Sequence, residues 1–183
     1  MAKLLIRTIP FILILLVVSC AQPQGTLPEY NQQLSIEEQK IQNQLFADSW
    51  LKTYIDVSET GLNILFNAVD LCKEEDQIFG IGVDIATRYD GPEAIRSELT
   101  KALLLSDEIT VVATGINTPA RNAGLKAGDK IIEINSFAAP YGIDANTEFY
   151  KTIRESNDKK HKLLINRNGQ DLVINVQSKK RCR

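Results

Sequence analysis

Two short apolar runs on either side of a glycine-containing turn are the clearest pattern along this chain. Residues 111–113 form the first run and residues 131–134 the second, with Lys, Asp, Thr and Gly around them. Short apolar runs bounded by such residues are typical of buried strands. Between the two runs, Pro119 suits the first position of a short helix, and Gly124 suits the left-handed residue that ends it. The pattern therefore predicts strand, one-turn helix, turn and strand.

The segment before this pattern has the periodicity of helices. Ser35 and Glu38 form a capping box, which predicts a helix start, and a possible cap at Ser58 followed by Gly61 predicts a break near residues 57–61. A second helix is then expected to end at Cys72. The apolar positions of the two helices are Ile41, Leu45, Leu51, Ile55, Leu62, Leu65, Phe66 and Val69. Trp50 and Tyr54 are interpreted as packing the first helix onto its neighbour, with a partner-binding surface as the alternative.

Three further elements follow from spacing and turn residues. Apolar residues four apart predict a helix over residues 92–103, which either shields a groove or extends the core, and Asp144 can cap another helix. Residues 161–167 and 172–176 are predicted to be strands, and the Asn168-Gly169 pair between them predicts a hairpin turn. The expected core positions of the two helices are Ile95, Leu99, Leu103, Phe149 and Ile153.

A second glycine-containing loop carries the candidate binding chemistry. Gly80-Ile81-Gly82-Val83 directly precedes a predicted strand over residues 83–87. Glycines allow successive backbone N–H groups to point into one concavity, which can bind a carboxylate. The alternative is a turn that glycine permits and that has no ligand.

Together these residues resemble a PDZ domain of the bacterial type. The resemblance rests on the pattern SPA-x-x-AGL-x-x-GD-x-I-x-x-I-N and on a loop similar to Gly-Leu-Gly-Phe. It implies an α+β fold over residues 73–182: a PDZ-like, partly open β-barrel or sandwich with flanking helices, preceded by a helical segment over residues 35–72. Leu125 is expected in its core. The matching residues are Thr118-Pro119-Ala120, Ala123-Gly124-Leu125, Gly128-Asp129, Ile131, Ile134 and Asn135.

The PDZ resemblance also implies a peptide site. The strand over residues 83–87 would be an exposed edge to which an extended peptide adds, Asn146 would contact a polar group of the ligand, and Tyr150 would narrow an apolar pocket. A larger residue at Gly82 is expected to weaken capture of a peptide C-terminus with little loss of folding. The implied peptide-binding residues are Gly80, Ile81, Gly82, Val83, Ile85, Asn146 and Tyr150.

The N-terminus has the pattern of an export signal. Residues 1–19 begin with Lys3 and Arg7 and continue into an apolar run too short to span a bilayer. The run ends in Val17-Val18-Ser19-Cys20, which resembles the lipobox of bacterial lipoproteins. That resemblance implies cleavage before Cys20, a lipid on its sulfur and a fatty acid such as palmitate on its amine; the alternative is a secretory signal without lipid.

The residues after this cysteine extend the picture of an anchored protein. Ala21, rather than Asp, favours the outer membrane facing the periplasm. Residues 20–34 are rich in Gln, Pro and Asn, which predicts a flexible tether. Loss of Lys3 and Arg7 with the signal lowers 21 basic residues to 19, against 23 acidic ones. This acidic balance argues against nucleic-acid binding.

The histidine count argues against an enzyme. A zinc peptidase of the HExxH type needs two histidines one helical turn apart, and the chain has one histidine, His161. It lies among Lys159, Lys160 and Lys162 and is predicted to be a surface residue of a strand. A Ser-Lys dyad is not excluded by counting, although no serine has the context of a strained elbow. We therefore expect no catalytic residue, no metal site and no cofactor.

A closer resemblance covers residues from about 60 to 182. The region is similar to the PDZ-containing part that precedes the catalytic domain in bacterial M48-type metallopeptidases, and the chain stops at Arg183, where that peptidase domain would begin. One interpretation is an anchored module that recruits an envelope protein by strand addition. Another is the non-catalytic part of a truncated or split peptidase that works with a separate peptidase chain, and a third is a structural lipoprotein with a non-functional groove. The matching residues are Asn67, Leu71-Cys72, Gly80-Ile81-Gly82, Tyr89, the segment 118–135 and Cys182.

The cysteines give one more expectation. If Cys20 carries lipid, Cys72 and Cys182 remain as a pair in an exported, oxidising compartment. The two ends of a PDZ domain approach each other, and the resembled peptidases have both cysteines, so a disulfide that encloses the domain is implied. Two unrelated thiols are the alternative.

Overall fold

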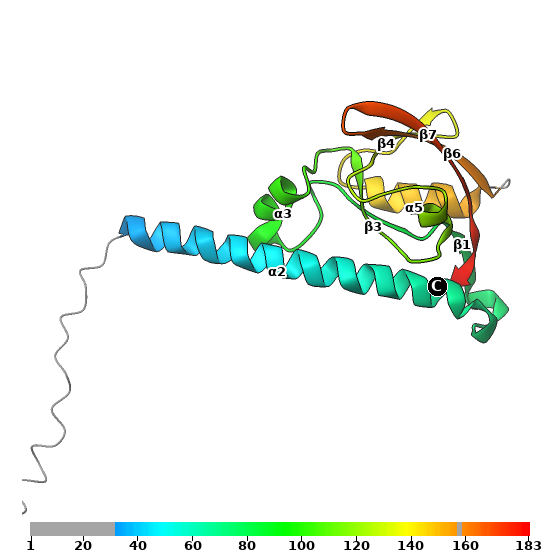
Figure 1. The fold of residues 1–183 in the computed structure, drawn as a ribbon, viewed down its shortest axis with the longest axis horizontal. Helices are drawn as coiled ribbons and strands as arrows, with labels where there is room; N and C mark the ends of the chain where they lie inside the picture. Colours follow the sequence, from blue (N-terminus) through cyan, green and yellow to red (C-terminus); the bar gives the residue numbers. More distant parts are fainter. Residues whose placement is uncertain (1–31, 157–158) are drawn as a thin grey trace, which may run out of the picture. The chain divides into compact units, whose positions relative to one another are not determined.

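The computed structural model describes residues 32–156 and 159–183 of the chain (Figure 1). Ile36–Arg183 form one unit. The predicted signal peptide, the lipid site at Cys20 and most of the predicted tether lie outside the described residues. No helix in the described part of the chain is both long and apolar enough to cross a bilayer.

The predicted break at residues 57–61 is wrong, because α2 runs without interruption from Gln32–Asn67 (Figure 1). A glycine in a helix interior costs about 1 kcal/mol relative to alanine, so packing on both sides of it can maintain the helix. Before Gly61, Ser58 contacts the sheet through Asp84; after it, Leu62 contacts the backbone turn at Gly115. These tertiary contacts hold one straight helix through the glycine.

Both predicted ends of the helical segment also differ from the structure. Ser35 lies inside α2 and is not its cap, so the last three residues of the predicted tether are helical. Gln and Leu are good helix formers, which explains why the helix does not need to begin at the capping box. At the other end α2 stops at Asn67, and a short 3-10 helix, Val69–Leu71, leads to Cys72.

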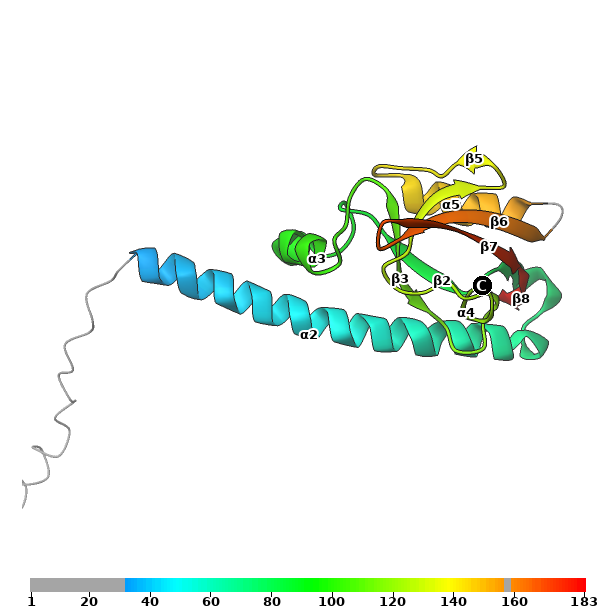
Figure 2. The same ribbon diagram turned by 45° about the horizontal axis from the view of Figure 1, so that its top comes forward.

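The strands form one open sheet and one small two-stranded ribbon, and every pairing is antiparallel. The ribbon joins β1 to β8, which places the last strand beside the first. The larger sheet has the order β2-β3-β4-β6-β7, with β5 beside β4, and β6 and β7 lie side by side in Figure 2. The strands are β1 Gln77–Gly80, β2 Val83–Ala86, β3 Ile109–Thr114, β4 Lys130–Ile134, β5 Phe137–Ala138, β6 Lys160–Arg167, β7 Gln170–Gln177 and β8 Lys179–Cys182.

Short helices complete an α+β, PDZ-like fold, as the sequence predicts. The predicted helix over residues 92–103 is a 3-10 turn, Glu93–Ile95, followed by α3, Arg96–Ala102. Pro119 begins α4, Pro119–Asn122, and α5 spans Ala145–Glu155. The sheet has free edges and does not close into a barrel.

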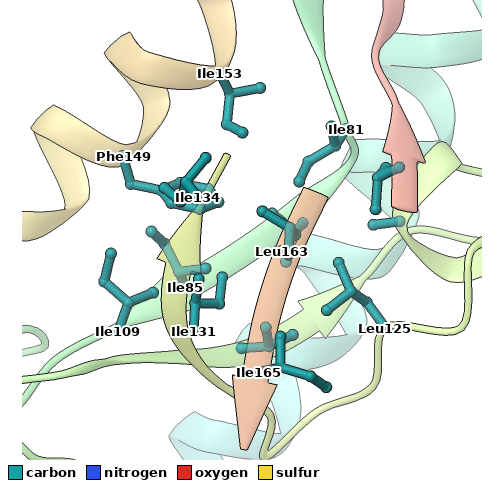
Figure 3. Close-up of a cluster of buried hydrophobic side chains, with 14 of the residues drawn as sticks. Ile81, Ile85, Ile109, Leu125, Ile131, Ile134, Phe149, Ile153, Leu163 and Ile165 are labelled. Carbon is teal, nitrogen blue, oxygen red and sulfur yellow. The ribbon is translucent and has the colours of Figure 1, made fainter. Parts of the chain in front are cut away.

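The main core lies between the sheet and α5, where side chains from β2, β4, β6 and α5 point toward one another (Figure 3). Leu125, in the loop after α4, is 2% exposed and belongs to this core, as predicted. Phe149 and Ile153 belong to it too. The cluster consists of Ile81, Val83, Ile85, Ile109, Val111, Ala120, Leu125, Ile131, Ile134, Ala145, Phe149, Ile153, Leu163, Ile165 and Val176.

A second, smaller cluster attaches α3 to α2. Ile95 and Leu99 bury their side chains against Ala47, with Trp50 and Leu51 packed at the margin. The helix predicted over residues 92–103 therefore extends the hydrophobic packing toward α2. The same cluster confirms the prediction that Trp50 packs α2 onto a neighbouring element, here the segment that contains Ile95 and Leu99.

The hairpin of β6 and β7 has the predicted turn, but His161 on β6 is buried and not at the surface. Asn168 and Gly169 both have positive φ, 53° and 84°, as a two-residue hairpin turn requires. His161 is 1% exposed, because it shares the inward face of β6 with Leu163 and Ile165 while the lysines point outward. The prediction of a surface histidine is therefore wrong.

One contact and its burial define the state of this histidine. The Nε2 atom of His161 lies 3.2 Å from the Oγ of Ser178, and its Nδ1 has no partner among the described residues. Burial lowers the pKa of His161 below its ordinary value, and the positive charge of Lys159 acts in the same direction. The imidazole is therefore neutral near pH 7.

Cys72 and Cys182 form a disulfide, with 5.9 Å between their Cα atoms. The pairing of β1 with β8 brings the two cysteines together, because Cys182 lies opposite Gln77 in that ribbon. The structure agrees with the pairing that the resemblance implies. The bond closes a ring around the whole sheet.

Candidate functional site: the groove between β2 and α5

The loop between β1 and β2 is shaped by contacts with Thr118. Gly82 has a φ of +78°, and the carbonyl oxygens of Gly82 and Gly115 both lie within hydrogen-bond distance of the Thr118 hydroxyl, at 3.1 and 2.7 Å. A Cβ atom on Gly82 would lie 2.3 Å from the Cβ of Thr118. The expectation that a larger residue at Gly82 leaves folding intact is therefore wrong.

This loop lines a cavity of about 300 Å³ at one end of the groove. The amides of Ile81 and Gly82 have no acceptor among the described residues. The cavity walls come from the loop, from α5, from β8 and from Leu62 and Leu65 of α2. The predicted loop therefore lines this cavity, and backbone amides of a glycine-containing loop are donors of the kind that anion sites use.

Two arginines that the sequence analysis did not identify line the same cavity. Arg154 lies near the end of α5 and Arg181 on β8, and neither belongs to an ion pair among the described residues. Burial lowers the pKa of Arg181, and the positive charge of Arg154 acts in the same direction. The cavity is thus lined by two arginines without ion pairs and by two residues whose amides have no acceptor among the described residues. The Arg181 guanidinium also donates to the Cys182 carbonyl at 2.9 Å. Only the pairing of β8 with β1 brings Arg181 here, so no local sequence signal could have revealed it.

The groove edge of β2 is not open, in contrast to the exposed edge expected from the sequence. The Tyr150 hydroxyl donates to the Val83 carbonyl at 3.2 Å, and the Asn146 amide donates to the Ile85 carbonyl at 3.5 Å. The Ile85 N–H donates to the carboxylate of Asp84 at 3.0 Å. Side chains therefore occupy the backbone groups that an added strand would use.

Helix α2 forms an additional wall of the groove. The Ser58 hydroxyl donates to the Asp84 carboxylate at 2.6 Å, and Glu59 forms an ion pair with Arg121. Asp84 also acts on Tyr54 of the same helix: burial raises the pKa of Tyr54, and the negative charge of Asp84 raises it further. The groove of this chain therefore has three walls, namely β2, α5 and α2.

A second cavity of about 230 Å³ lies further along the groove, between α2, β2, the segment before α3 and the first turn of α5. Asp84 and Tyr150 line both cavities, so the two are adjacent. The predicted site residues divide between them: Gly80, Ile81, Gly82 and Val83 line the first, Ile85 and Asn146 line the second, and Tyr150 lines both.

Comparison with known proteins gives matches of fold only. No protein-family model and no curated protein sequence matches the chain. The HtrA-type protease AlgW with decapeptide is similar at 23% identity over 58% of this chain and 30% of that chain, with a TM-score of 0.46. The HtrA3 PDZ domain bound to a phage-derived ligand is similar at 19% identity over 57% of this chain and 88% of that chain, with a TM-score of 0.41. A PDZ domain protein from Parabacteroides distasonis is similar at 16% identity over 57% and 20% of the two chains, also with a TM-score of 0.41.

Proposed function

We propose that this chain is a non-catalytic peptide-binding module of the bacterial envelope, anchored by lipid on Cys20, that recruits a partner protein through its C-terminus. The observation that carries this proposal is the lining of the first cavity, which combines Ile81 and Gly82, whose amides have no acceptor among the described residues, with Arg154 and Arg181. Amides without acceptors and guanidinium groups without counter-ions are matched by a carboxylate. The C-terminal carboxylate of a peptide supplies that charge at the end of an extended backbone.

Strand addition along β2 requires the ligand to replace contacts already present. Its backbone amides must displace the Tyr150 hydroxyl from Val83 and the Asn146 amide from Ile85. Those bonds are long, at 3.2 and 3.5 Å, and exchanging one hydrogen bond for another costs little net free energy. Removal of the hydroxyl in Tyr150→Phe is therefore expected to tighten peptide binding.

A screen against peptides with free C-termini tests the carboxylate site. The full chain carrying Cys20→Ser is titrated with each binder as free acid and as amide. Amidation should weaken binding about tenfold or more, because it removes a charge-assisted contact. Arg154→Gln should have a similar effect on the free acid, while Lys151→Gln, an exposed residue of the same helix, serves as the matched control. Absence of any binder, or binders indifferent to amidation, contradicts the proposal.

The anchor is tested separately. Cys20→Ser should release the protein from membranes into the periplasm and abolish labelling by a fatty-acid analogue, because the lipid attachment atom is lost. A Cys20→Ser protein that still partitions with membranes as before excludes the lipoprotein proposal.

A second proposal is that the chain is the non-catalytic PDZ portion of an M48-type metallopeptidase. The observation that favours it is the disulfide between Cys72 and Cys182, the two positions that the resemblance implies. The DNA downstream of residue 183 tests it. A reading frame that continues into an HExxH sequence supports this second function, and its absence together with peptide binding supports the first.

A further inference from the structure

The second cavity combines acidic, aromatic and apolar groups, and we propose that it is a subsite for a lysine or arginine side chain of the bound peptide. The inference rests on the proposed function, because it concerns the ligand of the same groove. It adds a chemical class to that ligand, which would carry a basic side chain upstream of its C-terminal carboxylate.

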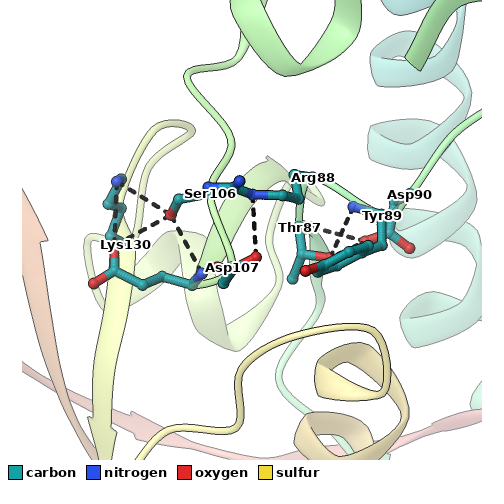
Figure 4. Close-up of polar contacts among 8 residues, drawn as sticks. Thr87, Arg88, Tyr89, Asp90, Ser106, Asp107 and Lys130 are labelled. Atoms are coloured by element: carbon teal, nitrogen blue, oxygen red, sulfur yellow. Dashed lines mark hydrogen bonds and ion pairs between the residues drawn. The ribbon is translucent and has the colours of Figure 1, made fainter. Parts of the chain in front are cut away.

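The two carboxylates of this cavity lack counter-ions. Asp84 accepts hydrogen bonds from Ser58, from the Ile85 amide and, at 3.5 Å, from the Tyr150 hydroxyl. Asp90 accepts from the N–H and hydroxyl of Thr87, at 2.7 and 2.9 Å (Figure 4). Neither takes part in an ion pair among the described residues. These hydrogen bonds orient the carboxylates but leave their negative charge unbalanced.

The nearest arginine in sequence does not supply that charge. Arg88 is paired with Asp107, with 3.1 Å between Nε and the carboxylate oxygen (Figure 4). The positive charge of Arg88 is thus paired with Asp107 and not with Asp90. Asp90 is therefore left without an ion-pair partner among the described residues.

An aromatic wall faces these carboxylates. The rings of Trp50 and Tyr54 are stacked with 4.7 Å between centroids and an interplanar angle of 12°, and both residues line the cavity. Aromatic faces attract lysine and arginine cations. Burial raises the pKa of Tyr54, and the negative charges of Asp84 and Asp90 act in the same direction.

The remaining lining suits the rest of a long basic side chain. Leu99, Leu103, Leu105 and Val112 give an apolar surface for its methylene groups. The Oδ1 atom of Asn146 is buried and receives no hydrogen bond from the described residues, so it offers an acceptor to an ammonium or guanidinium. An apolar ligand side chain would leave both carboxylates and this acceptor unmatched, at a cost in affinity.

Because the two cavities are adjacent, they favour one direction of the peptide chain along the groove. Arg154 and Arg181 line only the first cavity and Asp90 only the second, while Asp84 and Tyr150 line both. A peptide with a free carboxylate in the first cavity directs an upstream side chain toward the second. The groove is therefore electrostatically matched to one orientation of the peptide.

Trp50 provides a direct readout, because it is the only tryptophan in the chain. The full chain carrying Cys20→Ser is titrated with N-acetyl-lysine methylamide and with N-acetyl-norleucine methylamide while tryptophan emission is recorded. The lysine probe should change the emission and bind about tenfold tighter than the neutral probe, because the charge contacts carboxylates and an aromatic face. Equal binding by the two probes, or no change in emission with either, overturns the inference.

A variant pair locates the effect. Asp90→Asn can still accept from Thr87 but removes the charge, and it should reduce the preference for the lysine probe about tenfold. Asp171→Asn on β7 removes an exposed charge away from the cavity and should preserve the preference. Thermal melts of both variants confirm that they are folded, and a preference unaffected by Asp90→Asn overturns the inference.

Peptides separate this inference from the proposed function. Free-acid peptides with lysine or norleucine at successive upstream positions are compared by the same emission. Tighter binding with lysine at one position supports the subsite. Binders that depend on the free carboxylate but are indifferent to lysine at every position contradict the subsite alone, whereas failure of all peptides with retained lysine-probe binding contradicts the carboxylate site alone.

Discussion

The Cβ atom of Thr118 lies 2.3 Å from the position that a Cβ atom would take on Gly82. This pair joins the candidate binding loop to α4, because the Thr118 hydroxyl also contacts the Gly82 carbonyl. The fully buried side chain of Thr118 thus holds the loop that contains the amides of Ile81 and Gly82 in place. Its shape is part of the fold and does not depend on a ligand.

Gly82→Ala is therefore expected to destabilise the whole domain. A left-handed alanine costs roughly 1–2 kcal/mol, and the overlap with Thr118 should add about 1–3 kcal/mol. Gly142→Ala is the matched control, since Gly142 has a φ of +84° and open space for a Cβ. Urea unfolding of both variants isolates the steric part, and equal losses would show that Thr118 does not constrain the loop.

Arg167 and Asp129 provide a second test. The guanidinium makes two hydrogen bonds to the carboxylate, at 2.6 and 2.7 Å, and Asp129 is fully buried. Arg167→Met leaves that carboxylate without a cation and should cost about 3 kcal/mol of unfolding free energy. In a double-mutant cycle with Asp129→Asn, measured by urea unfolding, we expect a coupling of at least about 1 kcal/mol. Additive effects would mean that the two residues act independently.

The disulfide should contribute to stability through the unfolded state. Its cysteines are 110 residues apart, and closing a loop of about 100 residues contributes at most about 4–5 kcal/mol on chain-entropy arguments. Cys72→Ser is therefore expected to lower the melting temperature and to free the thiol of Cys182. Peptide mapping of the oxidised protein should contain the linked pair, and two alkylatable thiols in the untreated protein would exclude it.

His161 predicts a pH dependence of stability. Its pKa in the folded protein is lowered by burial, so the unfolded state binds more protons at pH values between the folded pKa and about 6.5. Its contribution to stability is complete above about pH 6.5 and is lost as the pH falls through the folded pKa, by at most about 1.4 kcal/mol per pH unit. An NMR titration of this single histidine should give a pKa below 6.5. His161→Gln should have a smaller slope of stability between pH 7 and 5, and an unchanged slope would contradict this origin.

The sequence predicted best those elements that local rules determine. Positive φ at Gly124 and in the turn of the β6–β7 hairpin is a requirement of one or two residues, and the structure has it at the predicted places. Burial of Leu125 and Phe149 also follows from local spacing. These features need no knowledge of distant parts of the chain.

Several of the wrong predictions depend on how an element packs against other segments of the chain. Gly61 does not break α2, because Ser58 and Leu62 on either side of it contact the sheet and its turns. His161 is buried because strand alternation outweighs its lysine neighbours. The unpaired Arg181 enters the groove only through the pairing of β8 with β1. Tertiary pairing thus decides most of the electrostatics of the site.

The disulfide between Cys72 and Cys182 affects how the domain responds to proteolytic cleavage. A single cut in any loop between these two residues leaves both fragments covalently attached to each other. The nicked domain would keep its strands at high local concentration and migrate as one species on a non-reducing gel. One cleavage before Cys72 can release α2, and the domain would then lose the third wall of its groove while the disulfide still linked the two ends of the remaining domain.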